Sequence, residues 1–286
     1  MKVLVTGVKG QLGFDVVNEL KKRGHEAIGV DIEEMDITCE NAVKTTLKEI
    51  SPDAVVHCAA WTAVDAAEDE ANADKVYAIN ALGTKYIAEA CKASGCKMVY
   101  ISTDYVFDGN GETPWEPDCK EYAPLNYYGA TKLEGEKFVS SILEKYFIVR
   151  ISWVFGKNGN NFIKTMLKVA EKVPSLRVVN DQIGTPTYTL DLAKLLVDMV
   201  ETERYGYYHA SNEGGYISWY DFACEIFRQA GVDVSVNPVT TAEYGISKAK
   251  RPFNSRLEKK KLTENGFERL PAWQDALGRY LAEIKN

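Results

Sequence analysis

Residues 2–13, KVLVTGVKGQLG, join a short apolar run to a turn with three glycines. The run over 2–6 predicts a buried strand, and the pattern from residue 11 onward predicts a helix. Glycines at such a junction permit a tight turn, and the first N–H groups of the helix can then bind a pyrophosphate. The spacing of Gly7, Gly10 and Gly13 is G-x-x-G-x-x-G and not the commoner G-x-G-x-x-G, so its place between a strand and a helix carries the interpretation. This stretch therefore predicts the opening of a dinucleotide-binding sheet.

The alternation of β-branched runs with longer amphipathic ones continues to residue 151. Strands are predicted at 2–6, 26–30, 53–58, 97–102 and 146–151. Helices are predicted at 11–23, 40–50, 73–94 and 127–144, and later at 160–172, 188–202, 218–230 and 273–284. Such alternation gives right-handed crossovers and a parallel sheet covered on both faces. We therefore predict an α/β fold, with a doubly wound parallel-sheet Rossmann domain over 1–150. A smaller C-terminal substrate lobe is predicted over 151–286, from which part of 176–202 returns to the main sheet.

The composition is that of an ordinary acidic chain. Of its 286 residues 45% are hydrophobic and 26% are charged, and the formal net charge is −7. Nucleic-acid binding needs a surplus of Lys and Arg, so no nucleic-acid partner is expected. The apolar runs are too short for a membrane span, and with no visible targeting signal a cytoplasmic location is expected. The six cysteines form no Cys-x-x-Cys pair and the three histidines are scattered, so no metal site is predicted.

Asp31 directly follows the second predicted strand, where a carboxylate would meet the adenosine ribose of a dinucleotide. A carboxylate there accepts hydrogen bonds from two ribose hydroxyls and repels an additional phosphate. The residue therefore favours NAD(H), with NADP(H) as the alternative. An isolated aspartate in a loop would simply be solvated, and it is the preceding glycine turn that favours the binding role.

A tyrosine and a lysine stand four residues apart at Tyr128 and Lys132. Residues four apart share a helix face, so Lys132 is predicted to face Tyr128 and not Tyr127. Unit charges ~4 Å apart at an effective dielectric of ~20 interact by about 4 kcal/mol, which would lower the pKa of a phenol from ~10 to around 7. We interpret Tyr128 as a proton donor tuned by Lys132, with Thr103 hydrogen-bonded to the same substrate oxygen.

The same spacing recurs at Tyr244 and Lys248, in the second half of the chain. No glycine turn and no strand end with a hydroxyl residue accompanies this second pair. We therefore interpret it as a coincidence. Gly129, beside Tyr128, is expected to leave room for cofactor or substrate.

Together these motifs resemble the extended short-chain dehydrogenase/reductase superfamily, and a narrower likeness runs along most of the chain. It rests on STDYVFDG (102–109), PLNYYGATKLEGE (124–136), RISWVFG (150–156), GNNF (159–162), NDQIGTPTYTLDLA (180–193) and RPFNSRL (251–257). In this order the segments resemble the dTDP-4-dehydrorhamnose reductase family. The resemblance implies reduction of the 4-keto group of dTDP-6-deoxy-L-lyxo-4-hexulose with NAD(P)H to give dTDP-L-rhamnose, and hence a nucleotide-sugar partner.

The resemblance also implies roles for individual residues. Tyr128 would donate the proton, Lys132 would hold the nicotinamide ribose, and Thr103 would position the keto oxygen. Cofactor-binding residues would be Gly7, Gly10, Gln11, Leu12, Gly13, Asp31, Asp36, Ile37, Ala59, Ala60, Trp61, Asn80, Tyr128 and Lys132. Substrate-binding residues would be Thr103, Asp104, Trp153, Asn161, Arg251 and Arg256. The two arginines would meet the diphosphate, or else be solvated or paired with carboxylates, and Trp153 could equally belong to the core.

Two other functions stay open at this point. One is a regulatory dinucleotide-binding subunit like the β subunit of methionine adenosyltransferase. The other is a reductase or epimerase for a different nucleotide sugar. Some relatives hold a divalent cation with acidic side chains near a dimer contact, and Asp15 could contribute to such a site. Leu190 stands where another carboxylate would be expected, so no metal is predicted, although the resemblance allows a homodimer.

Overall fold

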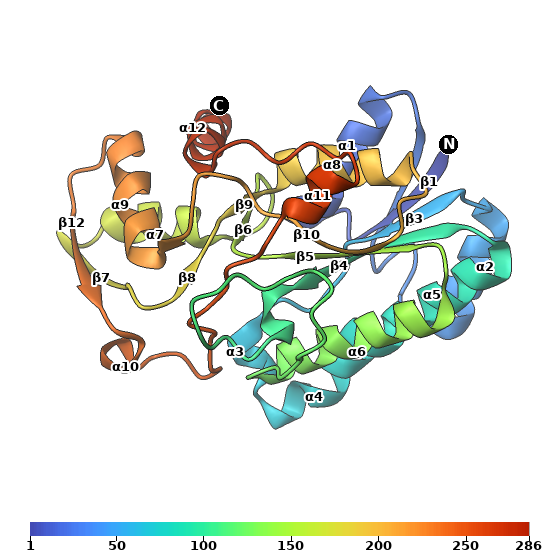
Figure 1. Cartoon of the computed structure of the whole chain (residues 1–286), viewed down its shortest axis with the longest axis horizontal. Coiled ribbons are helices and arrows are strands. Elements are labelled where there is room, and N and C mark those ends of the chain that lie inside the picture. The colour runs from blue at the N-terminus through green and yellow to red at the C-terminus, as the bar shows by residue number, and fades with distance from the viewer. Residues whose placement is uncertain (286) are drawn as a thin grey trace.

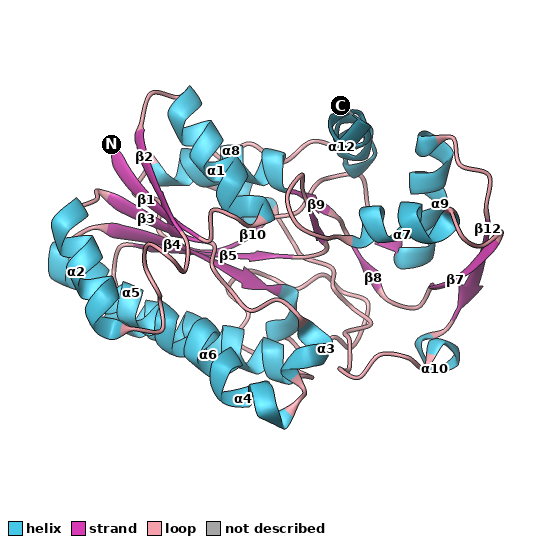
Figure 2. Ribbon diagram, turned by 180° about the vertical axis from the view of Figure 1, so that it is seen from behind, coloured by secondary structure: helices cyan, strands magenta, loops and turns pink. Residues whose placement is uncertain are grey.

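The computed structural model describes residues 1–285, and its centre is one parallel sheet (Figure 1, Figure 2). The strands run in the order β10-β5-β4-β3-β1-β2, and each neighbouring pair is parallel. Their bounds are β1 Lys2–Thr6, β2 Glu26–Val30, β3 Ala54–His57, β4 Lys97–Thr103, β5 Tyr146–Ile151 and β10 Gly206–His209. The strand order reverses beside β1, and a crevice opens at the carboxyl ends of parallel strands at such a point.

Helices cover both faces of this sheet (Figure 1). The helices on one face are α1 Gln11–Lys22 and α8 Thr189–Val200, and those on the other are α2 Glu40–Ile50, α5 Gly83–Ser94 and α6 Tyr127–Ile142. Successive strand residues point to opposite faces, so β1 supplies both cores. Val3 and Val5 pack in the core under α8, whereas Leu4 packs in the core under α5. The predicted doubly wound α/β class is confirmed.

The helix predicted over 73–94 is a chain of shorter pieces. After α3 Val64–Ala67, α4 Glu70–Tyr77 runs through a π-helical turn, Ala78–Leu82, into α5. Single π-helical turns inside α-helices are frequent at functional sites. Here the wider turn carries Asn80, whose side chain is described below.

Part of the segment 176–202 lies against the main sheet, and part does not. The strand β7, Ser175–Val179, pairs in parallel with β12, Ser235–Val239, outside the main sheet. The helix α8 packs on α1, and β10 then adds the sixth strand beside β5. The sequence pattern missed β10 because its four residues, Gly-Tyr-Tyr-His, are neither β-branched nor alternating. The division of the chain at residue 150 stays a prediction.

The remaining elements form the smaller part of the molecule. They are β6 Val154–Phe155 paired with β9 Thr187–Tyr188, β8 Ile183–Gly184 paired with β11 Ile217–Ser218, and the helices α7 Phe162–Ala170, α9 Trp219–Ala230, α10 Thr241–Tyr244 and α12 Trp273–Lys285. The helix α11, Lys260–Glu264, instead packs on β10 of the main sheet. Much of their core is aromatic: Phe155 stacks on Tyr188, and Tyr280 meets both edge-on. Large flat rings bury much apolar area, which stabilises a unit with few long strands.

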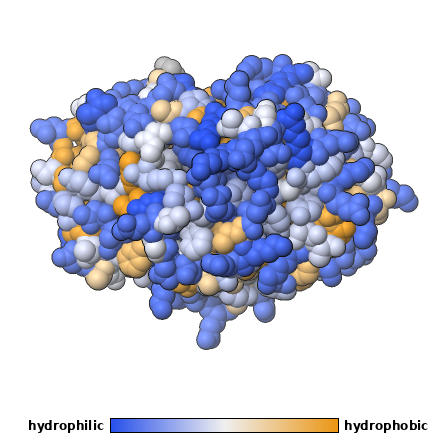
Figure 3. All heavy atoms as spheres, in the orientation of Figure 1, coloured by the Kyte–Doolittle hydropathy of each residue, from blue (hydrophilic) through white to orange (hydrophobic). Residues whose placement is uncertain are grey.

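The surface is mainly polar. From the side of Figure 1, hydrophilic residues cover most of it and apolar residues appear in separate patches (Figure 3). Within residues 1–285, none of the helices is long and apolar enough to cross a membrane.

Candidate active site

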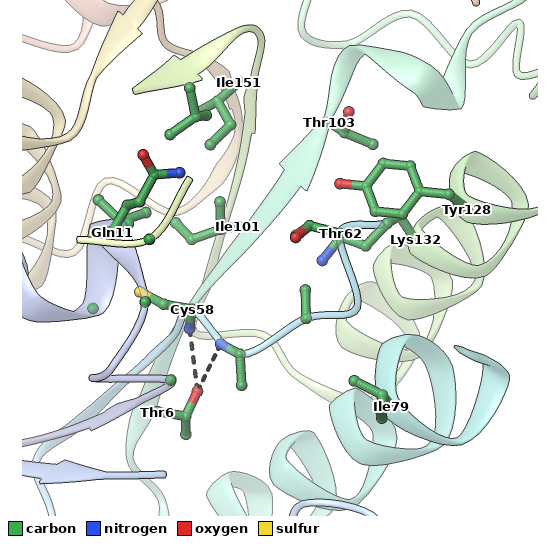
Figure 4. A pocket seen from close by; sticks show the side chains of 18 of the residues that line it. Thr6, Gln11, Cys58, Thr62, Ile79, Ile101, Thr103, Tyr128, Lys132 and Ile151 are labelled. Atoms are coloured by element: carbon green, nitrogen blue, oxygen red, sulfur yellow. Dashed lines mark hydrogen bonds between the residues drawn. The ribbon is translucent and has the colours of Figure 1, made fainter. Parts of the chain in front are cut away.

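A cavity of about 1020 Å³ opens at the carboxyl ends of the parallel strands (Figure 4). The residues that line it come mainly from the turns after β1 to β5, and others come from the end of β4, α4 and the π-helical turn that follows it, α6, the first turn of α9 and the segment that holds Arg251. Ligand pockets commonly measure roughly 300–1,000 Å³. A cavity at the upper end of that range has room for a dinucleotide and a second molecule beside it.

The glycine turn forms one wall of this cavity. Gly7 has a left-handed φ of 69°, and its carbonyl accepts the N–H of Gly10 at 3.0 Å. A Cβ on Gly13 would lie 2.4 Å from that same carbonyl oxygen, so the turn can close only on glycine. Gly10 is the N-cap of α1 and has no side chain to bond the first-turn N–H groups. Those groups, next to the cavity-lining Gln11, suit a pyrophosphate.

Asp31 lies where the sequence predicted it, at the cavity end beyond β2. Its carboxylate accepts the backbone N–H groups of Lys9 at 2.9 Å and of Ile32 at 3.0 Å, which fixes its position. Asp36 and Ile37 line the same end. Lys9 also lines this end of the cavity, and no feature of the sequence predicts it, because a lysine within a glycine turn carries no distinctive spacing.

A buried chain of hydrogen bonds supports the turn after β3. The Thr84 hydroxyl donates to the Asn80 carbonyl at 2.8 Å, so Nε2 of His57 must donate to Thr84 and Nδ1 must accept from Thr6. Oγ1 of Thr6 in turn accepts the N–H groups of Cys58 and Ala59, both at 3.1 Å (Figure 4). Burial lowers the pKa of His57 to about 3, so its ring is neutral. This network holds Ala59 and Ala60, for which the resemblance implied cofactor contacts, at the cavity lining.

Asn80 and Trp61 do not line the cavity, although the resemblance implied cofactor contacts for both. The Asn80 amide accepts the Trp61 N–H at 2.8 Å and donates to the Trp61 carbonyl and to the Thr131 hydroxyl. The indole of Trp61 bonds the Ala63 carbonyl. Asn80 therefore fixes the loop after β3 from outside the cavity, because the Trp61 backbone and the Thr131 hydroxyl occupy its polar groups.

Thr103, Tyr128 and Lys132 all line the cavity, on its side opposite the glycine turn (Figure 4). Thr103 ends β4, while Tyr128 and Lys132 lie one turn apart on α6. The Tyr128 hydroxyl lies next to the Thr103 side chain, whose own hydroxyl donates to Asp104 at 3.0 Å. The predicted constellation is thus brought together.

The predicted lowering of the Tyr128 pKa is wrong for the free protein. Burial, helped by the nearby Asp104 carboxylate, raises the pKa of Tyr128 instead. The Lys132 ammonium lies 4.2 Å from the centre of the Tyr100 ring and is buried, which lowers its own pKa to about 7. Burial away from water disfavours the charged forms of both side chains, the phenolate and the ammonium. The charge–charge interaction expected from the sequence did not include this desolvation cost. Burial likewise raises the pKa of Asp104 to about 6.

Tyr127 points away from the cavity, as the helix geometry predicted, and its hydroxyl donates to the Ala73 carbonyl at 3.3 Å. Gly129 has a different role from the expected one. A Cβ there would lie 2.3 Å from the carbonyl oxygen of Tyr105, so the missing side chain allows backbone contact and not ligand access. Tyr244 and Lys248 lie outside the cavity lining, and Lys248 pairs with Asp69.

Behind the site, Arg150 and Glu136 form an ion pair that is buried on both sides. The Glu136 carboxylate, four residues beyond Lys132, also accepts the Ser102 hydroxyl at 2.5 Å. Arg150 donates further to the Pro117 carbonyl and to the Tyr122 hydroxyl. This pair ties β5 to α6 and to the end of β4, so it fixes the elements that carry the predicted catalytic residues.

Trp153 lines the cavity in an unusual backbone conformation, with φ at 50°. A bulky residue in the left-handed region costs of order 1–3 kcal/mol and persists where its surroundings hold it. Here the Trp153 ring stacks on Trp219 with 3.7 Å between centroids. Trp219, the first residue of α9, was not predicted, because no motif marks it. The two rings form one aromatic wall.

Arg251 lines the cavity, whereas Arg256 and Asn161 do not. The Arg251 guanidinium donates to Asp65 at 2.7 and 3.1 Å, so it lies at the cavity as a carboxylate-paired arginine. Arg256 is turned toward Asn254. Asn161 caps α7 and donates to the side chains of Gln11 and Tyr280. Neither Arg256 nor Asn161 therefore lies at the cavity where the resemblance implied a substrate contact, and protein partners occupy the side-chain amide of Asn161.

Asp15 is buried and accepts the Thr189 hydroxyl at 2.5 Å. Burial raises its pKa to about 6. Within the described part of the chain, the structure contains no group of three or more His, Cys, Asp or Glu residues arranged to hold a metal ion.

Comparison with known proteins extends over the whole chain. The family model described as RmlD substrate binding domain matches residues 1–286. The spore coat polysaccharide biosynthesis protein SpsK of Bacillus subtilis is 42% identical, covering 99% of this chain and 97% of its own. A dTDP-4-dehydrorhamnose reductase of Escherichia coli K12 is 39% identical, covering 99% and 98%. A Bacillus anthracis dTDP-4-dehydrorhamnose reductase solved in complex with NADP is 43% identical, with a TM-score of 0.94 over 99% and 100% of the two chains.

These likenesses and the Rossmann sheet place the chain among the oxidoreductases that depend on a nicotinamide dinucleotide. Within that class, the chain belongs to the RmlD family, that of the dTDP-4-dehydrorhamnose reductases. The resemblance seen in its sequence segments is confirmed.

Proposed function

We propose that this protein reduces the 4-keto group of dTDP-6-deoxy-L-lyxo-4-hexulose with NAD(P)H, forming dTDP-L-rhamnose. One observation carries the proposal: Thr103, Tyr128 and Lys132 line the same cavity as the glycine turn. The activity named for relatives that match nearly the full chain supports this substrate.

The catalytic roles follow from the chemistry of a ketone becoming an alcohol. When bound, the reduced nicotinamide supplies a hydride to the carbonyl carbon. Tyr128 donates its proton to the carbonyl oxygen as negative charge develops there, and Thr103 stabilises that charge through a hydrogen bond. A phenol with a raised pKa still serves, because an alkoxide is much the stronger base. Lys132, next to Tyr128 on the helix face, holds the nicotinamide ribose.

The remaining cavity residues divide between the two ligands. The first turn of α1 and the loop after β3 would hold the dinucleotide, with Asp31 on the adenosine ribose and NAD(H) favoured over NADP(H). The wall of Trp153 and Trp219 would meet the sugar, with Asp104 beside Thr103. Arg251 would meet the substrate diphosphate, which explains how an acidic chain can hold an anionic substrate.

Tyr128→Phe, compared with Tyr127→Phe, tests the mechanism. Removing the proton donor should lower kcat for the 4-keto sugar nucleotide by roughly 10²–10⁴-fold, with little change in dinucleotide affinity. Tyr127→Phe removes only a bond to the Ala73 carbonyl and should keep kcat within about twofold. The assay follows the loss of NADH absorbance with each enzyme. An undiminished rate in Tyr128→Phe would refute the assigned acid.

The same assay separates the alternatives. An epimerase regenerates its cofactor within each cycle, so net consumption of NADH excludes it. A regulatory subunit would bind the dinucleotide without turning over the sugar nucleotide. In that case the proposed activity is wrong even though the cavity is used.

A further inference from the structure

The turn after β2 carries a compact set of charges beside the cavity end that holds Asp31. The ammonium of Lys9 is 2.6 Å from the Glu33 carboxylate, and the two side chains are 60% and 59% exposed. The nearby Asp31 and Glu34 carboxylates also favour the charged form of Lys9 and help to raise its pKa. The Glu34 carboxylate accepts the Asp31 N–H at 2.9 Å. Lys9 and Asp31 line the cavity, whereas Glu33 lies outside its lining.

These charges act in opposite directions on a phosphate carried by the adenosine ribose. A 2′-phosphate would be repelled by the Asp31 carboxylate and attracted by the Lys9 ammonium. Glu33 neutralises that ammonium from the solvent side. An exposed ion pair contributes little net binding energy because water screens both charges, so a phosphate dianion can compete with Glu33 for Lys9. The competition between a 2′-phosphate and Glu33 for the Lys9 ammonium is therefore close enough that removing one charge changes its outcome.

We propose that the Lys9–Glu33 pair sets the discrimination between NAD(H) and NADP(H), with Glu33 holding Lys9 away from a 2′-phosphate. The inference rests on the proposed function, because it takes Asp31 to lie at the adenosine ribose. Glu33→Gln should free Lys9 and strengthen binding of 2′-phosphorylated nucleotides. One unit charge about 6 Å away at an effective dielectric of ~40–80 corresponds to a gain of roughly 3- to 10-fold.

The test measures equilibrium binding by titration calorimetry, independently of catalysis. Adenosine 2′,5′-bisphosphate and ADP probe the adenosine half of the site, and NADP⁺ and NAD⁺ probe the full site. The variants are Glu33→Gln, Lys9→Met and the double variant. Glu40→Gln is the matched control, because it removes one carboxylate from an exposed pair with Lys44 that does not line the cavity.

Glu33→Gln should bind the bisphosphate and NADP⁺ roughly 3- to 10-fold more tightly, with ADP and NAD⁺ unchanged. The gain should shrink with added salt, disappear in the double variant and be absent in Glu40→Gln. If wild-type protein binds NAD⁺, an unchanged bisphosphate affinity in Glu33→Gln overturns this inference and leaves the proposed function standing. A gain in bisphosphate affinity that persists in the double variant, without Lys9, does the same. Failure of wild-type protein to bind either dinucleotide overturns the proposed function as well.

Discussion

Gly129→Ala tests whether backbone contact sets the geometry of the site. The added Cβ would lie 2.3 Å from the Tyr105 carbonyl oxygen and 3.1 Å from its carbon. An ordinary contact is roughly 1 Å longer, so the start of α6 must move away from the segment that follows β4. That segment begins directly after Thr103, and Tyr128 adjoins Gly129. The shift therefore separates the two hydroxyl groups that the mechanism brings to one carbonyl oxygen.

The expected effect on activity exceeds the effect on stability. Overpacking of this kind costs about 1–3 kcal/mol of unfolding free energy. A displacement of ~1 Å in a catalytic group can lower the rate by about 10²-fold. The measurements are kcat with the 4-keto sugar nucleotide and urea unfolding of the same preparation. We expect kcat to fall by about two orders of magnitude, while the protein still unfolds cooperatively.

Val139→Ala provides the control for stability, because Val139 is fully buried on α6 and packs in the core under the sheet. Deleting its methyl groups should lower the free energy of unfolding by roughly 2 kcal/mol and leave kcat nearly unchanged. Wild-type kcat in Gly129→Ala, or an equal loss of kcat in Val139→Ala, would show that the contact with Tyr105 does not govern the site.

Two further predictions concern buried charges. Glu136→Gln leaves Arg150 buried beside a neutral partner and should lower the free energy of unfolding by roughly 3–5 kcal/mol, whereas Glu134→Gln, from an exposed pair, should lower it by less than ~1 kcal/mol; equal urea midpoints would contradict this. Burial raises the folded-state pKa of Asp104 from 3.8 to about 6, so this group's contribution to stability is complete below pH 3.8 and is lost as pH rises through 6. Asp104→Asn should therefore be more stable than wild type by up to about 3 kcal/mol at pH 7 and equal to it near pH 4, and urea titrations showing no gain at pH 7 would rule out that penalty.

The first half of the fold was predictable because local signals and tertiary structure agree there. Five parallel strands and their helices follow β-branched and amphipathic runs that burial on both faces requires. The short ladders of the smaller part, such as β6 with β9, are two residues long and leave no period to detect. β10 was missed for a related reason, since four residues of Gly, Tyr and His do not indicate a strand.

Within the site, prediction succeeded where a residue's position follows from a strand end or a helix face. Thr103 ends β4, Asp31 directly follows β2, and Tyr128 and Lys132 share a helix face. A side chain's position could not be predicted where its partner is distant in sequence, as the Tyr280 partner of Asn161 is. The direction of the Tyr128 pKa shift failed because burial is a property of the assembled cavity, which no spacing reveals.

The position of β10 limits how this protein can be recombined with its relatives. A chimera that joins the first 150 residues of one homologue to the remainder of another would place a foreign edge strand beside β5 and a foreign α8 beneath α1. Exchanging the loops on either side of 189–209, with that segment kept alongside its own sheet, should preserve the native packing. Substrate specificity could then be transferred between homologues without changing the packing of α8 and β10 against the main sheet.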